Sequence, residues 1–302
     1  MKHGLIRRAL LYTLSMTLLS VGLSAGCAKE VPTSAARVRL ENLHVLFSEA
    51  DSQTSFANIP AAATGRLVVT VPFNTGSGGG WTDADVKRNV SDLRSIENMD
   101  YLVLRMTRVT DEGLTNISSI SQLRHLHLGM TDVSDKGIAS LLALPHLEGL
   151  YLDMSDRVTG DSLRSFQNVP LRKLSLRGTS VSDDTMRALG ELTKLEHLDL
   201  GITGVGDMTL TIVAMLPSLK TLLVDSTRIT NDGMRQLLRC RKLSRLVVSK
   251  NPQITDDEVS ELCKLPQLRS LDLSGTAIEK ERIEDLRNAF PHLELVWSFG
   301  AK

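Results

Sequence analysis

The chain has 302 residues with 35 basic and 35 acidic side chains, and aromatic residues make up only 4% of it. Residues 1–26 contain three basic residues and no acid, so residues 27–302 hold 32 basic residues (35 − 3) against 35 acidic ones, a net charge of −3. No cluster of Lys and Arg stands out. This balance argues against a nucleic-acid-binding protein, which normally shows a basic excess.

Residues 1–26 predict an export signal. Lys2, Arg7 and Arg8 form a positive region, and an apolar run of 15 residues, 9–23, follows it; this run is short for a membrane span. The ending Leu23-Ser24-Ala25-Gly26-Cys27 resembles the bacterial lipobox, with Ser24 in place of the preferred Leu. The resemblance implies lipidation of Cys27 and a cell-envelope location, in the periplasm or on the outer membrane. Ordinary cleavage near this point and an uncleaved anchor are the alternatives.

Residues 27–65 predict a tether, because residues 51–64 are rich in Ser, Thr and Ala. Within the tether, residues 38–50 place apolar side chains at helical spacing, which predicts a short amphipathic helix that caps the following domain. Residues 66–98 predict an atypical N-terminal repeat with a degenerate strand at Val69 and Val71. Its glycine-rich loop, residues 75–80, lacks the Lys of a phosphate-binding loop, so we interpret it as a flexible insertion.

A repeat of 24 or 25 residues fills the remainder, with eight copies over residues 99–291 and a closing strand in residues 292–302. Its first apolar positions are Met99, Leu123, Leu147, Leu171, Leu195, Leu219, Leu243, Leu268 and Leu293. Two more apolar residues follow each anchor with period two, which predicts a short strand with one buried face. A fixed period of this length is typical of a solenoid.

Each copy continues with a turn and a short helix. A Thr recurs three residues after the strand, where its hydroxyl can bond the backbone of its own and the next repeat. Segments such as Val133-Ser134-Asp135-Lys136-Gly137-Ile138 then place a Ser or Thr cap and acidic residues at a helix N-terminus. Stacking these units predicts one parallel sheet on a concave side and all helices on a convex side.

The unit L-x-x-L-x-L-x-x-T-x-[VI]-[TS]-D-x-G-[LM] resembles the leucine-rich repeat family. It is most similar to the cysteine-containing subtype, whose C-x-x-L junction appears as Cys240-Arg241-Lys242-Leu243. The resemblance covers about two thirds of the chain and implies an α/β, right-handed leucine-rich-repeat solenoid of horseshoe or arc shape. It would hold about eight full repeats between terminal caps.

The outward side chains of the concave strands are the candidate binding residues. The set comprises Tyr101, Arg105, His125, His127, Tyr151, Asp153, Lys173, Arg177, His197 and Asp199. Tyr, Arg and His on a rigid sheet are residue types that anchor protein interfaces. A second interpretation of four of these residues is a zinc site, formed by His125, His127, Tyr151 and Asp153. Nothing in the sequence indicates partners that would orient them, so no metal or other cofactor is predicted.

The sequence contains no catalytic motif of the common hydrolase or metalloprotease types. Cys240 and Cys263 replace core Leu residues in adjacent repeats, which favours buried thiols over a disulfide. We therefore predict a non-enzymatic module that binds a protein or peptide partner through the concave sheet and is membrane-anchored at Cys27. The alternatives are a self-assembling structural protein of the envelope and, less favoured, a carbohydrate-binding or metal-binding protein.

Overall fold

The computed structural model describes residues 39–41, 46–49, 67–72, 80–255 and 258–298. The chain divides into two compact units, Met1–Ser34 and Ala35–Lys302, and all described residues belong to the second. The proposed lipidation site Cys27 and the predicted export signal lie outside the described residues. Within the described ranges, no helix is both long and apolar enough to span a bilayer.

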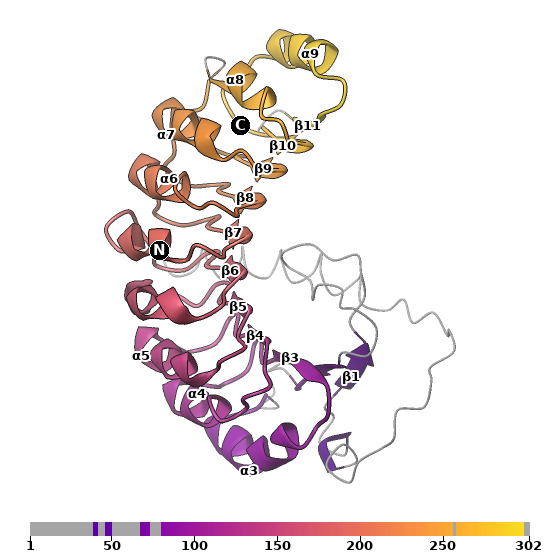
Figure 1. The fold of residues 1–302 in the computed structure, drawn as a ribbon, viewed down its shortest axis with the longest axis vertical. Helices are drawn as coiled ribbons and strands as arrows, with labels where there is room; N and C mark the ends of the chain where they lie inside the picture. Colours follow the sequence, from indigo (N-terminus) through magenta and orange to yellow (C-terminus); the bar gives the residue numbers. More distant parts are fainter. Residues whose placement is uncertain (1–38, 42–45, 50–66, 73–79, 256–257, 299–302) are drawn as a thin grey trace. The chain divides into compact units, whose positions relative to one another are not determined.

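The strands of the second unit form one 11-stranded sheet in simple chain order. β2 to β11 pair in parallel, each with the next strand along the chain. Figure 1 shows β4 to β9 stacked along one side of this unit. The strands are β1 (Leu46–Glu49), β2 (Leu67–Thr70), β3 (Met99–Val103), β4 (His125–His127), β5 (Gly149–Tyr151), β6 (Lys173–Ser175), β7 (His197–Asp199), β8 (Thr221–Leu223), β9 (Arg245–Val247), β10 (Ser270–Asp272) and β11 (Glu294–Val296).

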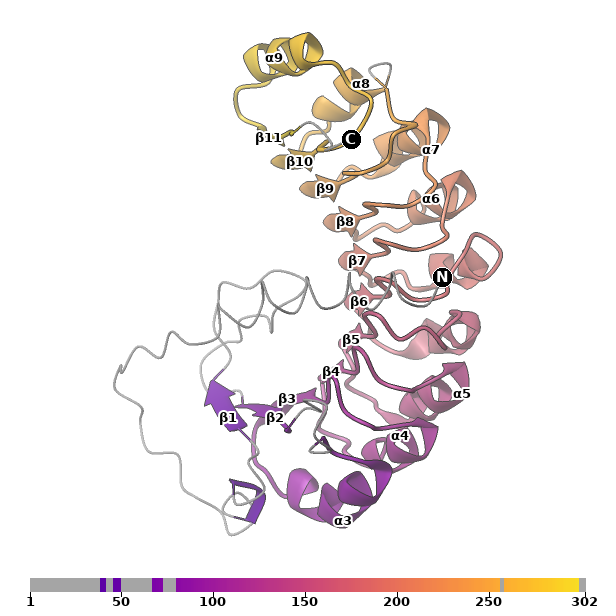
Figure 2. The same cartoon turned by 180° about the vertical axis from the view of Figure 1, so that it is seen from behind.

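Short helices follow the strands and lie on the opposite side of the core, as the view from behind in Figure 2 also shows. They are α3 (Asp83–Arg94), α4 (Asp111–Ile117), α5 (Asp135–Ile138), α6 (Asp207–Val213), α7 (Asn231–Gln236), α8 (Val259–Cys263), α9 (Lys280–Ala289) and the 3₁₀ helices η1 (Ala139–Ala143), η2 (Asp161–Asn168), η3 (Met186–Glu191) and η4 (Leu237–Arg239). The predicted alternation of strand and helix along a solenoid is confirmed.

The core consists of the periodic apolar positions read from the sequence. The repeat anchors from Met99 to Leu293 and the two apolar residues after each are almost all buried and belong to one continuous hydrophobic cluster. Each repeat buries its apolar side only against its neighbours, so the core extends along the sheet from repeat to repeat. This arrangement leaves the alternate strand residues on the side of the sheet that faces away from the core.

The recurring Thr closes the turn within its own repeat. Thr107 Oγ1 donates to the Leu104 carbonyl at 2.6 Å, and the equivalent bond recurs down the column. The residue before each of these Thr side chains has left-handed backbone dihedrals, with φ of 59° at Met106 and 57° at Ile202. At Asn251 the amide also reaches the preceding repeat, because Nδ2 donates to the Val224 and Val248 carbonyls.

The first-turn Asp of one repeat caps the helix of the next repeat. Asp111 accepts from Ser134 N at 2.7 Å, and Asp135 accepts from Thr159 N at 2.7 Å and Ser162 N at 3.0 Å. The predicted Thr caps are present as well, for example at Thr110. The acids therefore do more than complement the helix dipole, because they hydrogen-bond N–H groups that would lack partners in the neighbouring repeat.

These carboxylates also explain the Gly of the D-x-G pattern. A Cβ at Gly137 would lie 2.4 Å from Asp111 Oδ1, and one at Gly233 would lie 2.3 Å from Asp207 Oδ1. Any larger side chain would displace the capping carboxylate. Glycine is therefore required at these helical positions despite its low helix propensity.

The predicted helix over residues 38–50 is wrong. Residues 39–41 are helical, but Leu46–Glu49 forms β1, which pairs antiparallel with β2. The pairing satisfies backbone groups that the edge strand β2 would otherwise expose. Leu40 is nevertheless buried in the core, and Arg39 Nε donates to Asp92 of α3 at 2.8 Å, so this segment contacts the first repeat as expected.

The described residues before and after the full repeats also form regular elements, with β2 and α3 at one end and β11 at the other. β2 supplies buried Val69, and Thr82 forms a capping box with Asp85 at the start of α3. At the other end, β11 pairs with β10 and buries Leu295. The glycine-rich loop lies mostly outside the described residues.

Candidate functional site

The candidate residues all lie on the face of the sheet that points away from the core, which we call the sheet face. Parallel pairing sets Tyr101 beside His125 and His127 beside Tyr151. Their exposure differs from the open surface that strand alternation predicts. Five of the ten are buried, namely Tyr101, His125, His127, Tyr151 and Asp199, and five are partly exposed, namely Arg105, Asp153, Lys173, Arg177 and His197.

Aromatic stacking accounts for part of this burial. The rings of Tyr101 and His125 stack at 4.1 Å, and those of His127 and Tyr151 stack at 3.9 Å. Gly149 makes room for the first pair, because a Cβ there would lie 2.2 Å from His125 Nδ1. The stacked rings hold one another in fixed positions across β3 to β5.

His127 and His197 on the sheet face are uncharged at neutral pH. Burial lowers the pKa of His127 to about 3, helped by the positive charges of Arg105 and Lys173. Burial together with Lys173 lowers the pKa of His197 to about 4. His197 Nδ1 lies 3.0 Å from Thr221 Oγ1 on β8. His197 is therefore a neutral hydrogen-bonding group, and His127 is a neutral ring that stacks on Tyr151.

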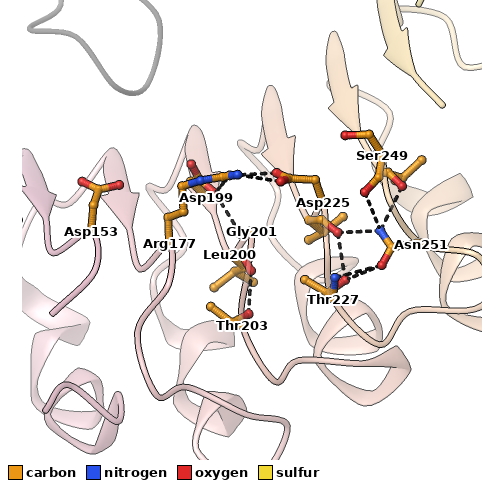
Figure 3. Close-up of polar contacts among 12 residues, drawn as sticks. Asp153, Arg177, Asp199, Leu200, Gly201, Thr203, Asp225, Thr227, Ser249 and Asn251 are labelled. Atoms are coloured by element: carbon orange, nitrogen blue, oxygen red, sulfur yellow. Dashed lines mark hydrogen bonds and ion pairs between the residues drawn. The ribbon is translucent and has the colours of Figure 1, made fainter. Parts of the chain in front are cut away.

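Arg177 joins two further strands through a buried group of charges that the sequence analysis did not anticipate (Figure 3). Its guanidinium donates to both carboxylate oxygens of Asp225 at 2.7 and 2.6 Å. It also lies 3.3 Å from Asp199 Oδ1, which accepts from Gly201 N at 2.8 Å. We call this group of Arg177, Asp199, Gly201 and Asp225 the arginine clasp.

Gly201 is a structural requirement of the arginine clasp. A Cβ at this position would lie 2.2 Å from Arg177 Nη1 and 2.6 Å from Asp225 Oδ1. The Arg177 guanidinium lies over the repeat that contains Gly201 and bonds Asp225 in the repeat after it. The same order of Arg, Gly and Asp occurs three repeats earlier as Arg105, Gly129 and Asp153. This recurring order is visible in the sequence, but only when several successive repeats are compared together.

A second row of charges precedes the strands. Arg124 pairs with Glu148 and lies 3.8 Å from Asp100. Farther along the sheet, Glu196 pairs with Arg172 and with Lys220, the latter at 2.6 Å. Acid and base alternate between neighbouring repeats here, so each charge has an opposite neighbour. The bases Arg172 and Lys220 are about half exposed, with side-chain exposures of 51% and 50%, so the pairs that they form contribute little to stability, about 0–1 kcal/mol each.

The described residues offer little chemistry for metal binding or thiol reactivity. No three His, Cys, Asp or Glu side chains in these ranges gather closely enough to hold a metal ion. Cys240 and Cys263 are both free and buried. Burial raises the pKa of each thiol to about 11, so the reactive thiolate is scarce at neutral pH. Both cysteines fill core positions.

Comparisons with known proteins agree with this fold. Two leucine-rich repeat family models match the chain, over residues 217–278 and residues 121–142. A comparison with curated protein sequences gives no significant match. The crystal structure of internalin C2 from Listeria monocytogenes is similar over 70% of this chain and 84% of its own, at 22% identity and a TM-score of 0.50. A second internalin of that species, inlF, is similar over 78% and 82% at 20% identity and a TM-score of 0.43.

The protein is thus a leucine-rich-repeat solenoid, a class whose domains typically mediate protein–protein interaction and are generally non-catalytic. At this level of identity the likeness to internalin C2 shows the fold alone. The particular partner has to be argued from the residues of this chain.

Proposed function

We propose that this protein is a non-enzymatic module of the bacterial cell envelope that binds a protein partner through the sheet face. The observation that carries the proposal is the fixed arrangement of the sheet face. Ring stacks hold Tyr101, His125, His127 and Tyr151, and the arginine clasp holds β6 to β8. Side chains that are already ordered lose little entropy when a partner binds, which favours affinity.

The partly exposed residues are the proposed contact groups. Arg105, Lys173 and His197 lie on or directly after β3, β6 and β7 and are partly accessible. The buried rings beside them position these groups without offering much contact area themselves. This division of roles refines the prediction that all ten candidates contact the partner.

The envelope location and the membrane anchor remain proposals that rest on the sequence. The positive and apolar stretch in residues 1–26 supports export, and the sequence before Cys27 supports lipidation there. Assignment to the cysteine-containing subtype is likewise proposed, supported by Cys240, whose sulfur lies 4.0 Å from the Val213 carbonyl of the preceding repeat.

A triple variant, Arg105→Ala, Lys173→Ala and His197→Ala, should capture less partner from native envelope than the wild type does. Loss of several contact groups should weaken binding by about tenfold or more, since one such residue often contributes over 1 kcal/mol. The measurement is quantitative pull-down with mass spectrometry. A matched control removes three exposed charges from the helix side, through Lys136→Ala, Arg164→Ala and Arg187→Ala. Equal capture by both triple variants and the wild type would refute the proposal.

A further inference from the structure

Five exposed basic side chains gather where the sixth, seventh and eighth repeats meet, which corrects the expectation that the chain has no such cluster. The segment 233–250 contains six basic residues and no acidic residue. Four of them, from the end of the sixth repeat and the start of the seventh, join one residue of the eighth repeat in what we call the basic edge: Arg239, Arg241, Lys242, Arg245 and Arg269, all exposed.

Backbone contacts place these residues together. Arg241 N donates to the Arg239 carbonyl at 2.9 Å, so the chain turns tightly between η4 and β9. Arg269 N donates to the Ser244 carbonyl at 2.8 Å, which sets Arg269 directly beside the start of β9. Arg245 begins β9 and pairs in register with Ser270 on β10. The basic edge therefore runs from the end of η4 to the sheet face.

Among the described residues, the basic edge lacks the ion pairs that balance charge on the earlier repeats, although Glu294, whose N–H donates to the Arg269 carbonyl, lies beside its last residue. There, Glu148 pairs with Arg124, and Glu196 pairs with Arg172 and Lys220. At the corresponding place in the seventh repeat the residue is Ser244. Among the described residues, the Arg269 guanidinium donates only to the carbonyls of Pro266 and Leu268. Basic residues that flank the edge do have acidic partners, as Lys264 has Glu261.

In the described part of the chain, no carboxylate forms an ion pair with any of the five residues. Five like charges over three successive repeats repel one another and create a positive potential at this edge. An anionic ligand would relieve that repulsion. The whole chain has a net charge of zero, so the positive charge of the basic edge is a local excess.

We propose that the basic edge binds an Asp- or Glu-rich segment of the protein partner, an inference that rests on the proposed function. Four of its five residues are Arg, whose planar guanidinium forms paired hydrogen bonds with a carboxylate. Its end at Arg245 is continuous with the sheet face, so a partner seated on the sheet can extend an acidic segment across it. This continuity favours a protein segment over a lipid surface or a nucleic acid.

The test measures binding of a fluorescent peptide of about ten Glu residues to the whole protein by anisotropy, at low salt and at about 0.3 M salt, where screening weakens exposed charge interactions. The double variant Arg241→Glu and Lys242→Glu should bind the peptide at least about tenfold more weakly than the wild type, because two attractive charges become repulsive. The control Lys136→Glu and Lys194→Glu makes the same change of net charge at exposed sites elsewhere and should bind like the wild type. Circular dichroism confirms that both variants are folded.

Two further arms separate this inference from its rivals. Vesicles with phosphatidylserine and a single-stranded oligonucleotide are offered in place of the peptide. Preference for either over the Glu peptide, or equal peptide binding by both double variants, would overturn the acidic-segment assignment. If the envelope partner binds the sheet-face triple variant as tightly as it binds the wild type, the proposed function is refuted separately from the acidic-segment assignment. Loss of peptide binding in Arg241→Glu, Lys242→Glu would still establish the basic edge as an acidic-peptide site.

Discussion

Arg177→Met is expected to destabilise the protein by about 3–5 kcal/mol, because removal of one partner leaves buried charges without compensation. Arg177 donates to Asp225 through its two terminal nitrogens, Nη1 and Nη2, and Nη1 also contacts Asp199. Both carboxylates are buried. Methionine keeps an unbranched apolar stem in place of the aliphatic part of arginine, so the loss reflects charge and hydrogen bonding more than lost packing of that stem. Urea denaturation at pH 8 provides the measurement.

The destabilisation should be smaller at pH 5 than at pH 8. Burial raises the pKa of Asp199 to about 7, against the lowering effect of Arg177 and the Gly201 N–H. A carboxyl whose folded pKa exceeds its unfolded pKa contributes stability below the unfolded value, and that stability is lost as pH rises through the folded pKa. Without Arg177 the pKa of Asp199 in the folded protein rises further. Lowering the pH should therefore restore part of the stability that the Arg177→Met variant has lost. The control Arg172→Met, at an exposed pair, should lose no more than about 1 kcal/mol. Equal losses in both variants would contradict the clasp.

Asp135→Ala is expected to lower the free energy of unfolding by about 2 kcal/mol, since the carboxylate caps a helix and bonds several donors at once. Its oxygens accept from Thr159 N, Gly160 N and Ser162 N, and from two hydroxyls. Although burial raises the pKa of Asp135, hydrogen bonds from Thr159 and Ser162 outweigh it and hold the pKa below its usual value. Its contribution is therefore present at neutral pH and is lost as pH falls through the folded pKa.

Asp132→Ala is the matched control for Asp135→Ala. Asp132 is exposed in the same repeat, so its replacement should change stability by less than about 0.5 kcal/mol. Thermal unfolding of both variants with the wild type, under identical conditions, makes the comparison. If Asp135→Ala unfolds like Asp132→Ala, the carboxylate does not link the two repeats in the way that the structure indicates.

The sequence predicts the repeat architecture well because that architecture depends on local spacing. The apolar positions from Met99 to Leu293 give the strands, and the Thr after each strand gives the turn. Both patterns act within a single repeat, so a period in the sequence is enough to place them. The same spacing assigned the sheet-face residues to the correct side of the sheet.

Contacts between repeats escaped the prediction. Within one repeat, the Asp of the D-x-G pattern is explained by its favourable interaction with the helix dipole. Its hydrogen bonds to the helix of the next repeat are seen only in the structure, where the repeats are stacked. Arg177 bonds Asp225, which lies 48 residues away in the sequence. The two residues are separated by the whole repeat that contains Gly201, so a comparison of adjacent repeats does not reveal the pair. For the same reason, the burial of Tyr151 and the gathering of Arg269 with Arg241 required the structure.

The prediction failed outright at residues 38–50. Their apolar spacing fits a helix, but Leu46–Glu49 pairs with β2 instead. The unpaired edge of a parallel sheet is a strong template for another strand, and a helical pattern in a short segment carries no information about that edge. Pairing with β2 in the folded protein therefore outweighs the helical pattern of this segment.

The most direct test of the central claim is photo-crosslinking in intact cells, with a light-activated amino acid placed at single positions of the full-length protein. Lys173 on β6 reports the sheet face, and the exposed Lys136 on α5 reports the helix side. We predict that the probe at position 173 crosslinks one discrete envelope protein and that the probe at position 136 does not. Crosslinking of the same protein from position 136 alone, or only of further copies of this chain from both positions, would contradict recognition of a partner by the sheet face.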